Sequence, residues 1–255
     1  MAYEHVLFKK RGPVSWIVLN RPERLNAFNT ALATESSEAL GLAIGDPETR
    51  AIVITGKGRA FSVGADVMEV ADDPNPRERI RILVDIAHRA ILSIRQTDKI
   101  VIAAVNHQAA GYGMALALAC DLRVATEKVR FYYAYSLLGL TGDGAINLFL
   151  PKRVGSARAL EVALTGEVLF EEEIAKFGLV TKFFREDSFL EETQNYAERV
   201  AACPSSVSGA IKHLMADSCG RDLAQHLEAE KARILDRVRE PEFLARAREI
   251  LGRSR

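Results

Sequence analysis

The stretch KIVIAAVNHQAAGYGMALALACD, residues Lys99–Asp121, decides the fold. Its first part, Ile100–Val105, is apolar without alternation, which is typical of a strand buried on both faces in a helix-covered parallel sheet. Small residues and glycines follow, and Met114–Cys120 is an apolar stretch suited to a buried helix. A strand, a glycine turn and a buried helix together aim free backbone N–H groups and a helix N-terminus at one point. That point favours a phosphate, a carboxylate or a developing oxyanion.

A second glycine-bearing turn strengthens this interpretation. One such turn is a weak signal, because any tight packing of a strand against a helix can use it. Ala51–Thr55 predicts another buried strand, and it leads into GKGRAFSVGAD at Gly56–Asp66. Two buried strands are therefore each followed by a glycine turn.

Composition excludes several classes of protein. The 255 residues suit one large domain, or one domain with an appendage, and the 34 Lys and Arg residues equal the 34 Asp and Glu residues in number. A formal net charge of zero argues against a nucleic-acid-binding protein. The three cysteines have no metal-ligand spacing, so we expect reduced thiols and no metal site. The N-terminus lacks an apolar signal core and no apolar run has membrane-spanning length, so we expect a cytoplasmic protein.

The pattern of predicted elements changes near residue 187. Strand and helix patterns alternate before this point, and only helical patterns follow it, at 189–202, 206–218, 222–239 and 241–251. We therefore expect an α/β core at residues 1–187, which carries the site, and a C-terminal α-helical region at 188–255.

Several motifs resemble the crotonase (enoyl-CoA hydratase/isomerase) superfamily. In the family's order and spacing, they are NRP at 20–22 with LNA at 25–27, FSxGAD at 61–66, IAAVN at 102–106, LALACD at 116–121 and LTG at 164–166. The resemblance implies a crotonase-type ββα spiral core and a role in fatty acid metabolism. It implies an acyl-CoA thioester substrate, with no cofactor besides the coenzyme A of that substrate. It also implies that the C-terminal helices pack the protein into a homotrimer or a dimer of trimers.

The resemblance assigns the two glycine turns a role. It implies that the backbone N–H groups of Ala65 and Tyr112 bind the thioester oxygen, where two preorganised donors can lower a barrier by several kcal/mol. Tyr112 stands where the family has glycine, so the N–H persists while the ring must be accommodated and could narrow the acyl pocket. The alternative is that both positions are plain packed turns.

The resemblance also implies contacts to the substrate. The residues at the matching positions are Arg24, Asn26, Ala27, Ala65, Asp66, Val67, Met68, Gly111, Tyr112 and Tyr135. Arg24 either pairs with a phosphate of coenzyme A or is a solvated surface arginine. Asp66 could instead stabilise its own turn by bonding to nearby backbone.

The sequence departs from the family at the residues that hydrate enoyl-CoA. The two glutamates of a hydratase fall at Ala115 and Tyr135, and neither side chain can replace a glutamate in proton transfer. Asp143 remains, in a loop that the family points at the acyl chain. A single carboxylate can move a proton between two carbons, so our first expectation is an isomerase-like reaction. Asp143 could instead be a helix N-cap.

His88 offers a different reaction. In the 4-chlorobenzoyl-CoA dehalogenase branch, a histidine and a nucleophilic aspartate fall at His88 and Asp143 with the same separation, and a tryptophan falls at Tyr135. This implies that the aspartate attacks the activated aromatic ring, and that a water activated by the histidine attacks afterwards. Hydrolysis of C–C bonds would suit the same pair. His88 could instead have only a packing role, since it lies at the border of the apolar stripe of an amphipathic helix predicted at 77–95. We rank this chemistry second, hydration third and a non-catalytic CoA-binding relative last.

Overall fold

The structure, a computed structural model, describes residues 3–220 and 222–238. They form two units, divided between Ala202 and Cys203. The first unit is the expected mixed α/β core, but it extends beyond residue 187. The reason is helix α9 (Phe189–Ala201), which packs on strands of the main sheet. Trp16 in that sheet also donates its indole N–H to Gln194 Oε1 of α9 at 2.6 Å.

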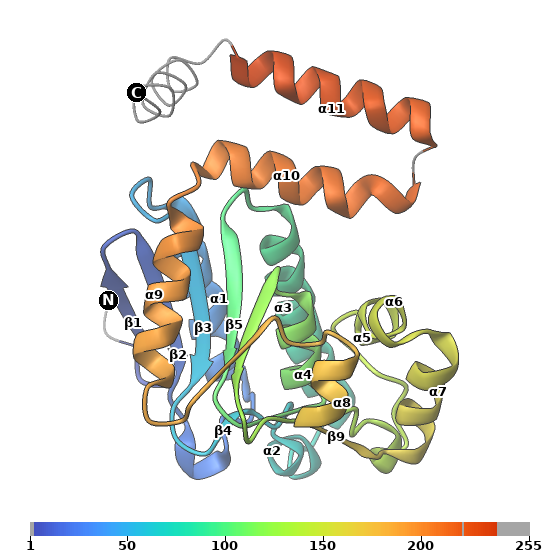
Figure 1. The fold of residues 1–255 in the computed structure, drawn as a ribbon. Coiled ribbons are helices and arrows are strands. Elements are labelled where there is room, and N and C mark those ends of the chain that lie inside the picture. The colour runs from blue at the N-terminus through green and yellow to red at the C-terminus, as the bar shows by residue number, and fades with distance from the viewer. Residues whose placement is uncertain (1–2, 221, 239–255) are drawn as a thin grey trace. The chain divides into compact units, whose positions relative to one another are not determined.

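A six-stranded sheet forms the centre of the first unit (Figure 1). In spatial order, its strands are β1 (Val6–Arg11), β2 (Val14–Leu19), β3 (Ala51–Gly56), β5 (Ile100–Val105), β7 (Leu122–Thr126) and β10 (Lys182–Phe184). β1 and β2 form an antiparallel hairpin, and every other neighbouring pair is parallel. All six residues of β3 are buried, as are all but the first of β5. The two predicted buried strands are therefore confirmed.

A second, smaller sheet was not predicted as a whole. It consists of β4 (Ala60–Ser62), β6 (Gln108–Ala110), β8 (Arg130–Tyr132) and β9 (Val168–Phe170) in that order, with β9 antiparallel to β8. Three of these strands escaped the sequence analysis because three residues are too few to show a hydrophobic period. The parallel pairing of β4 with β6 places the two glycine turns next to each other, since each turn follows one of these strands.

Helices cover both faces of the main sheet. The helices of the first unit are η1 (Pro22–Arg24), α1 (Thr30–Gly45), α2 (Val67–Ala71), α3 (Pro76–Gln96), α4 (Tyr112–Ala119), η2 (Ser136–Leu138), α5 (Ile146–Phe149), α6 (Pro151–Val154), α7 (Ser156–Thr165), α8 (Glu171–Lys176) and α9, of which α1, α3, α4 and α9 pack on this sheet. Ile52 and Ile54 of β3 share a core cluster with residues of α1, α3 and α4. Val53 joins a second cluster with Phe189 of α9. The side chains of one strand thus alternate between two apolar layers, as a sheet buried on both faces requires.

Arg123 secures the C-terminal end of α4. Its side chain is 1% exposed, and its guanidinium donates to Leu179 O at 2.6 Å and to Cys120 O at 2.7 Å. Burial lowers the pKa of Arg123 to about 10, which leaves it charged at neutral pH. A cation at this end complements the helix dipole and satisfies carbonyl groups that lack helical partners.

The variant Arg123→Met is expected to lower the free energy of unfolding by about 3 kcal/mol, because it leaves buried carbonyl oxygens without their donor. Urea unfolding followed by circular dichroism measures the change. Arg130→Met is the matched control, since Arg130 is exposed and lies 5.5 Å from the centre of the Phe170 ring. Its effect is expected to stay below about 1 kcal/mol. Equal losses in the two variants would contradict this role of Arg123.

The second unit is helical, as the sequence predicts. Its elements are α10 (Ser205–Asp217), η3 (Ser218–Gly220) and α11 (Leu223–Val238), and the helix predicted at 241–251 lies outside the described residues. Among residues 3–220 and 222–238, no helix has the length and apolar character needed to cross a bilayer. The expected oligomer and the cytoplasmic location stay predictions.

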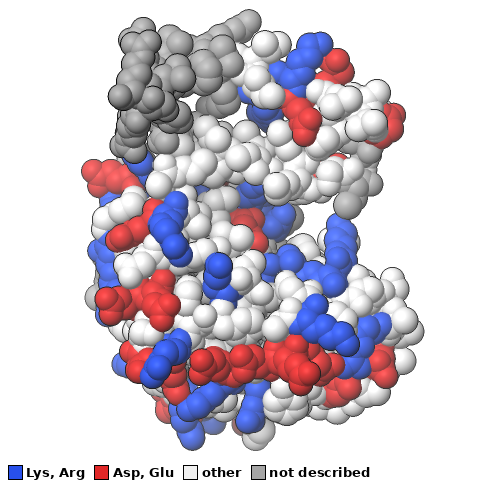
Figure 2. All heavy atoms as spheres, viewed as in Figure 1, with Lys and Arg blue, Asp and Glu red and all other residues white. Residues whose placement is uncertain are grey.

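Charged side chains of both signs share the surface. On the face of the first unit seen in Figure 2, acidic and basic side chains lie beside one another, as their equal numbers in the sequence lead one to expect.

Candidate active site

The two glycine turns approach each other closely. Gly64 follows β4 with φ +94°, and Gly111 follows β6 with φ +50°; these are backbone conformations that favour glycine. A Cβ atom on Gly64 would lie 3.0 Å from the carbonyl oxygen of Ala110 and 3.1 Å from the backbone nitrogen of Tyr112. The turns can therefore come this close because Gly64 has no side chain.

Two backbone N–H groups are available where the turns meet. Phe28 holds the first turn, since its N–H donates to Gly64 O at 2.7 Å and its carbonyl accepts from Asp66 N at 2.9 Å. Between these bonds, the N–H of Ala65 donates to no acceptor in the part of the chain that the structure describes. Tyr112 is the first residue of α4, so its N–H has no acceptor within the helix. This is the arrangement expected of an oxyanion hole, although its occupation by a thioester oxygen stays a prediction.

The ring of Tyr112 is packed rather than free. It is 7% exposed, meets Phe28 edge-on with 5.0 Å between ring centroids, and its hydroxyl donates to Ala87 O at 3.4 Å. Gly144 lies against its other side, where a Cβ atom would be 3.1 Å from the ring. Burial, with a smaller effect of the nearby Asp143 charge, raises the pKa of Tyr112, so its phenol stays protonated. The ring forms part of a cavity wall.

A cavity of about 610 Å³ opens beside the two turns. Both turns line it, together with α2, α3 and the segment 134–143. Most of the lining is apolar, with contributions from Phe28, Leu83, Val84, Leu138 and Leu140. Besides two tyrosines, the ionisable side chains that line it are His88 and Asp143. An apolar cavity with a few polar groups is typical of a small-molecule site.

His88 and Asp143 are in direct contact. His88 comes from α3 and Asp143 from the loop before α5, and His88 Nε2 lies 2.5 Å from Asp143 Oδ1. The Gly144 N–H also donates to Oδ1, at 2.6 Å. Among the described residues, the second carboxylate oxygen, Oδ2, receives no hydrogen bond. The side chains are 53% and 23% exposed, respectively.

This contact bears on the alternatives left open for both residues. The N-cap of α5 is Ala145 and has no side-chain cap hydrogen bond, so Asp143 does not cap that helix. His88 is more than half exposed and lines the cavity, so it is not packing within the buried stripe of α3. The structure thus brings together the two groups that the sequence analysis had considered as a pair.

The two positions of the missing glutamates have different surroundings. Ala115 is fully buried in α4. Tyr135 is 9% exposed, lines the cavity, and donates its hydroxyl hydrogen to the backbone oxygen of Asp143 at 3.4 Å. Burial raises the pKa of Tyr135, which makes this phenol a hydrogen-bond donor and not a base at neutral pH.

Two of the predicted substrate contacts have structural roles. The Asn26 side chain is fully buried, accepts from Arg21 N at 2.9 Å, and donates to the backbone carbonyls of Lys57 and Ala60 at 3.0 and 2.8 Å. Asp66 accepts from Glu69 N at 3.4 Å as the N-cap of α2 and pairs with Arg21 at 3.1 Å. Both side chains are committed to holding the loops beside the first turn.

The other predicted contacts differ in exposure. Arg24, Val67 and Met68 are exposed, and Val67 also lines the cavity. Ala27 is buried, and Gly111 donates its N–H to Tyr132 O at 3.1 Å. Contacts of these residues with coenzyme A stay predictions.

Sequence reasoning missed the part of the cavity that α2 and α3 supply. Val70, Ile80, Leu83 and Val84 line it, and the signal was the apolar stripe of α3. The N-terminal end of this stripe faces the cavity.

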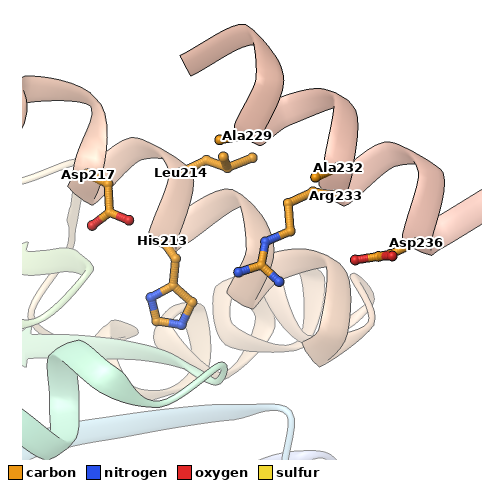
Figure 3. A pocket seen from close by; sticks show the side chains of 7 residues that line it. All are labelled: His213, Leu214, Asp217, Ala229, Ala232, Arg233 and Asp236. Atoms are coloured by element: carbon orange, nitrogen blue, oxygen red, sulfur yellow. The ribbon is translucent and has the colours of Figure 1, made fainter. Parts of the chain in front are cut away.

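A smaller cavity of about 300 Å³ lies between α10 and α11 in the second unit (Figure 3). Its lining includes His213 and Asp217 from α10 and Arg233 and Asp236 from α11. None of the predicted site residues belongs to it. Among the described residues, no group of three metal-ligating side chains gathers at this or any other place.

The sequence model of the enoyl-CoA hydratase/isomerase family matches residues 9–242. The chain belongs to this family. Members of the family act on acyl-CoA thioesters, so the resemblance seen in the sequence motifs is confirmed. The chain is 31% identical over 244 residues to 4-chlorobenzoyl coenzyme A dehalogenase-2 of an Arthrobacter species, covering 95% of this chain and 88% of that protein.

Other members of the enoyl-CoA hydratase/isomerase family have different activities. The chain is 31% identical over 230 residues to 1,2-epoxyphenylacetyl-CoA isomerase of Escherichia coli, covering 89% of this chain and 88% of that protein. The crystal structure of an enoyl-CoA hydratase from Bacillus anthracis superposes with a TM-score of 0.92 at 26% identity, covering 98% of this chain and 97% of that one. The fold is thus that of the family, while relatives at similar identity catalyse different reactions.

The variant Gly64→Ala is expected to lower kcat/KM for the acyl-CoA substrate about 100-fold, because the added methyl group separates the two N–H donors. It should also weaken the red shift in ultraviolet absorption that an aromatic acyl-CoA shows when its carbonyl is polarised. Gly41→Ala is the control, since no atom lies within 4 Å of a Cβ at this position in α1. Wild-type kinetics and absorption in Gly64→Ala would contradict the proposed donors.

Proposed function

We propose that this family member displaces a leaving group, such as a halide, from the ring of an aromatic acyl-CoA, with Asp143 as nucleophile and His88 as the base that activates water. The observation that carries the proposal is the 2.5 Å contact between His88 Nε2 and Asp143 Oδ1 in the cavity beside the two N–H groups. The contact favours this reaction over the isomerisation that the sequence alone ranks first. The likeness to the Arthrobacter dehalogenases supports it.

The first step uses the backbone donors and the free carboxylate oxygen. The N–H groups of Ala65 and Tyr112 bind the thioester oxygen and withdraw electron density from the ring. Asp143 Oδ2 then forms a bond to the ring carbon that bears the halide. The negative charge that develops in the ring is shared with the thioester oxygen, which the N–H groups and the N-terminus of α4 stabilise. The halide leaves with its bonding pair, and an aryl ester of Asp143 remains.

The second step uses His88. The imidazole takes a proton from water, and the resulting hydroxide adds to Cγ of Asp143. The bond between Cγ and the aryl oxygen then breaks. The phenolate leaves with the electron pair and takes up the proton of the carboxylic acid that forms at Asp143, so that the carboxylate is restored. The imidazolium of His88 then releases its proton to solvent. A base within hydrogen-bond distance of Oδ1 is placed next to Cγ, the atom that the water must attack.

The cavity suits a flat apolar group. Phe28, Tyr112 and Tyr135 contribute aromatic surfaces, and aliphatic side chains complete the lining. An aromatic acyl group can therefore be desolvated there. Since Asp143 Oδ2 accepts no hydrogen bond from the described residues, its lone pairs are available for attack.

Isomerisation is the second candidate. Among the residues that line the cavity, Asp143 carries the one carboxylate, and it can move a proton between two carbons without His88. The likeness to 1,2-epoxyphenylacetyl-CoA isomerase supports this alternative. Hydration ranks below both, since Ala115 supplies no acid, and a CoA-binding relative without turnover ranks last.

Turnover of a panel of CoA thioesters distinguishes these functions. We expect wild-type protein to release halide from 4-chlorobenzoyl-CoA and Asp143→Asn to be slower by at least about 1,000-fold, because the nucleophile is lost. The panel also contains 3-enoyl-, 2-enoyl- and 3-oxoacyl-CoA. Double-bond migration that Asp143→Asn abolishes would favour the isomerase instead. Water addition that survives the substitution would contradict a role of Asp143 in either reaction.

The variant His88→Gln is expected to slow the second step more than the first. Its kcat should fall about 100-fold or more, and an aryl ester should accumulate on Asp143 during turnover. Mass spectrometry of the Asp143 peptide after rapid acid quenching detects this ester. His107→Gln is the control, since His107 lies in the same unit but does not line the cavity. No ester and a wild-type kcat in His88→Gln would exclude His88 as the base.

A further inference from the structure

We propose that Tyr133 and Asn147 clamp the loop that carries Asp143 and so set the position of its carboxylate. They are positioning residues, since they act on Asp143 through the backbone of the loop and do not line the cavity themselves. The inference rests on the proposed function in one respect, namely that Asp143 is the reacting group.

Two polar side chains meet at one carbonyl of the loop. The Tyr133 hydroxyl lies 2.6 Å from Thr141 O and 2.8 Å from Asn147 Oδ1, and it can donate its single proton to either. Asn147 Nδ2 donates to Thr141 O at 2.7 Å. The carbonyl of Thr141, two residues before Asp143, therefore accepts from Asn147 and lies at the shorter of the two distances from the Tyr133 hydroxyl.

A neighbouring tyrosine holds the loop at a second carbonyl. Tyr135 donates to Asp143 O at 3.4 Å, and the rings of Tyr133 and Tyr135 meet edge-on with 5.3 Å between their centroids. Residues 133 and 135 therefore contact the alternate carbonyls of residues 141 and 143. The shorter distances are those of Tyr133, which makes it the stronger anchor.

The loop needs such anchors because its own backbone supplies few. Asp143 lies between η2 and α5 in neither helix nor strand, and its neighbours Gly142 and Gly144 have φ values of +97° and +61°. Ala145 follows with φ +60°, a conformation that a residue with a side chain adopts at a cost. Glycines on both sides of Asp143 would give an unanchored loop many conformations. One local bond, from Ile146 N to Asp143 O at 3.2 Å, holds the C-terminal side of the loop.

Tyr133 is the buried half of the clamp, while Asn147 is exposed. Tyr133 is 4% exposed, and a Cβ atom on Gly142 would lie 2.3 Å from its hydroxyl oxygen and 3.0 Å from Asn147 Nδ2. Burial raises the pKa of Tyr133, so its hydroxyl keeps the proton that it donates. A loop held this closely presents the Asp143 carboxylate to His88 in one place, and a shift of about 1 Å can slow a reaction about 100-fold.

The experiment compares Tyr133→Phe, Asn147→Ala and the double variant with the control Tyr132→Phe. Tyr132 is the preceding residue, and its hydroxyl makes no hydrogen bond within the described part of the chain. We expect kcat in each single variant to fall by about 10- to 100-fold with KM nearly unchanged. The fold-loss in kcat of the double variant should be smaller than the product of the fold-losses of the two single variants, because both side chains hold the same carbonyl.

A second readout does not depend on turnover. The ring nitrogens of His88, observed by nuclear magnetic resonance in the resting enzyme, report its contact with Asp143. In Tyr133→Phe and Asn147→Ala they should shift part of the way toward their values in Asp143→Asn, and in Tyr132→Phe they should not shift.

These readouts separate the possible results. Shifted His88 signals together with the loss in kcat support the clamp. Unshifted His88 signals overturn the clamp. If the variants also unfold at a lower temperature while the signals stay unshifted, Tyr133 and Asn147 have a general structural role and do not position Asp143. If the signals shift but no thioester in the panel is turned over, the clamp stands and the proposed reaction fails.

Discussion

The candidate active site depends on a contact between two turns that a side chain at Gly64 would prevent. β4 and β6 are short, but their parallel pairing directs the chain after each strand to the same place. Because Gly64 lacks a Cβ atom, its turn can approach the first residue of α4, where Tyr112 has an N–H without a helical acceptor. The position of the paired donors therefore follows from the backbone of the core and tolerates a bulky Tyr112 side chain.

The chemistry of the site has a second source that is independent of this backbone. His88 and Asp143 come from α3 and from an irregular loop, elements that line the same cavity as the two turns. Ala115 supplies no acid, so the carboxylate pair expected of a hydratase is absent, while the 2.5 Å contact joins a different pair, an imidazole and a carboxylate. A shared fold that carries different reacting side chains is consistent with relatives of this chain at similar identity having different activities.

The sequence predicted those parts of the molecule that produce a strong local signal. Unbroken apolar runs identified β3 and β5, and glycine after each run identified the turns. The three-residue strands of the smaller sheet have no such signal, and their pairing depends on contacts between distant segments. The end of the core was placed too early because α9 is amphipathic like the helices after it, and only its packing on the sheet assigns it to the first unit.

The candidate site shows the same limit. Asp143 and His88 were each compatible with an ordinary structural role, since an aspartate before a helix resembles a cap and a histidine beside an apolar stripe resembles packing. They are 55 residues apart, so their contact depends on how a loop folds against α3. Neither hydrophobic periodicity nor local motifs report such a contact, and the anchoring of that loop by Tyr133 is equally invisible in the sequence.

The most direct test of the central claim is a single turnover of 4-chlorobenzoyl-CoA in water enriched in ¹⁸O, with enzyme in excess over substrate. If Asp143 is the nucleophile, the oxygen transferred to the ring comes from its carboxylate, so mass spectrometry should find unlabelled product and ¹⁸O in the Asp143 peptide. Labelled product with an unlabelled peptide would show that water attacks the ring directly and would contradict the covalent role of Asp143.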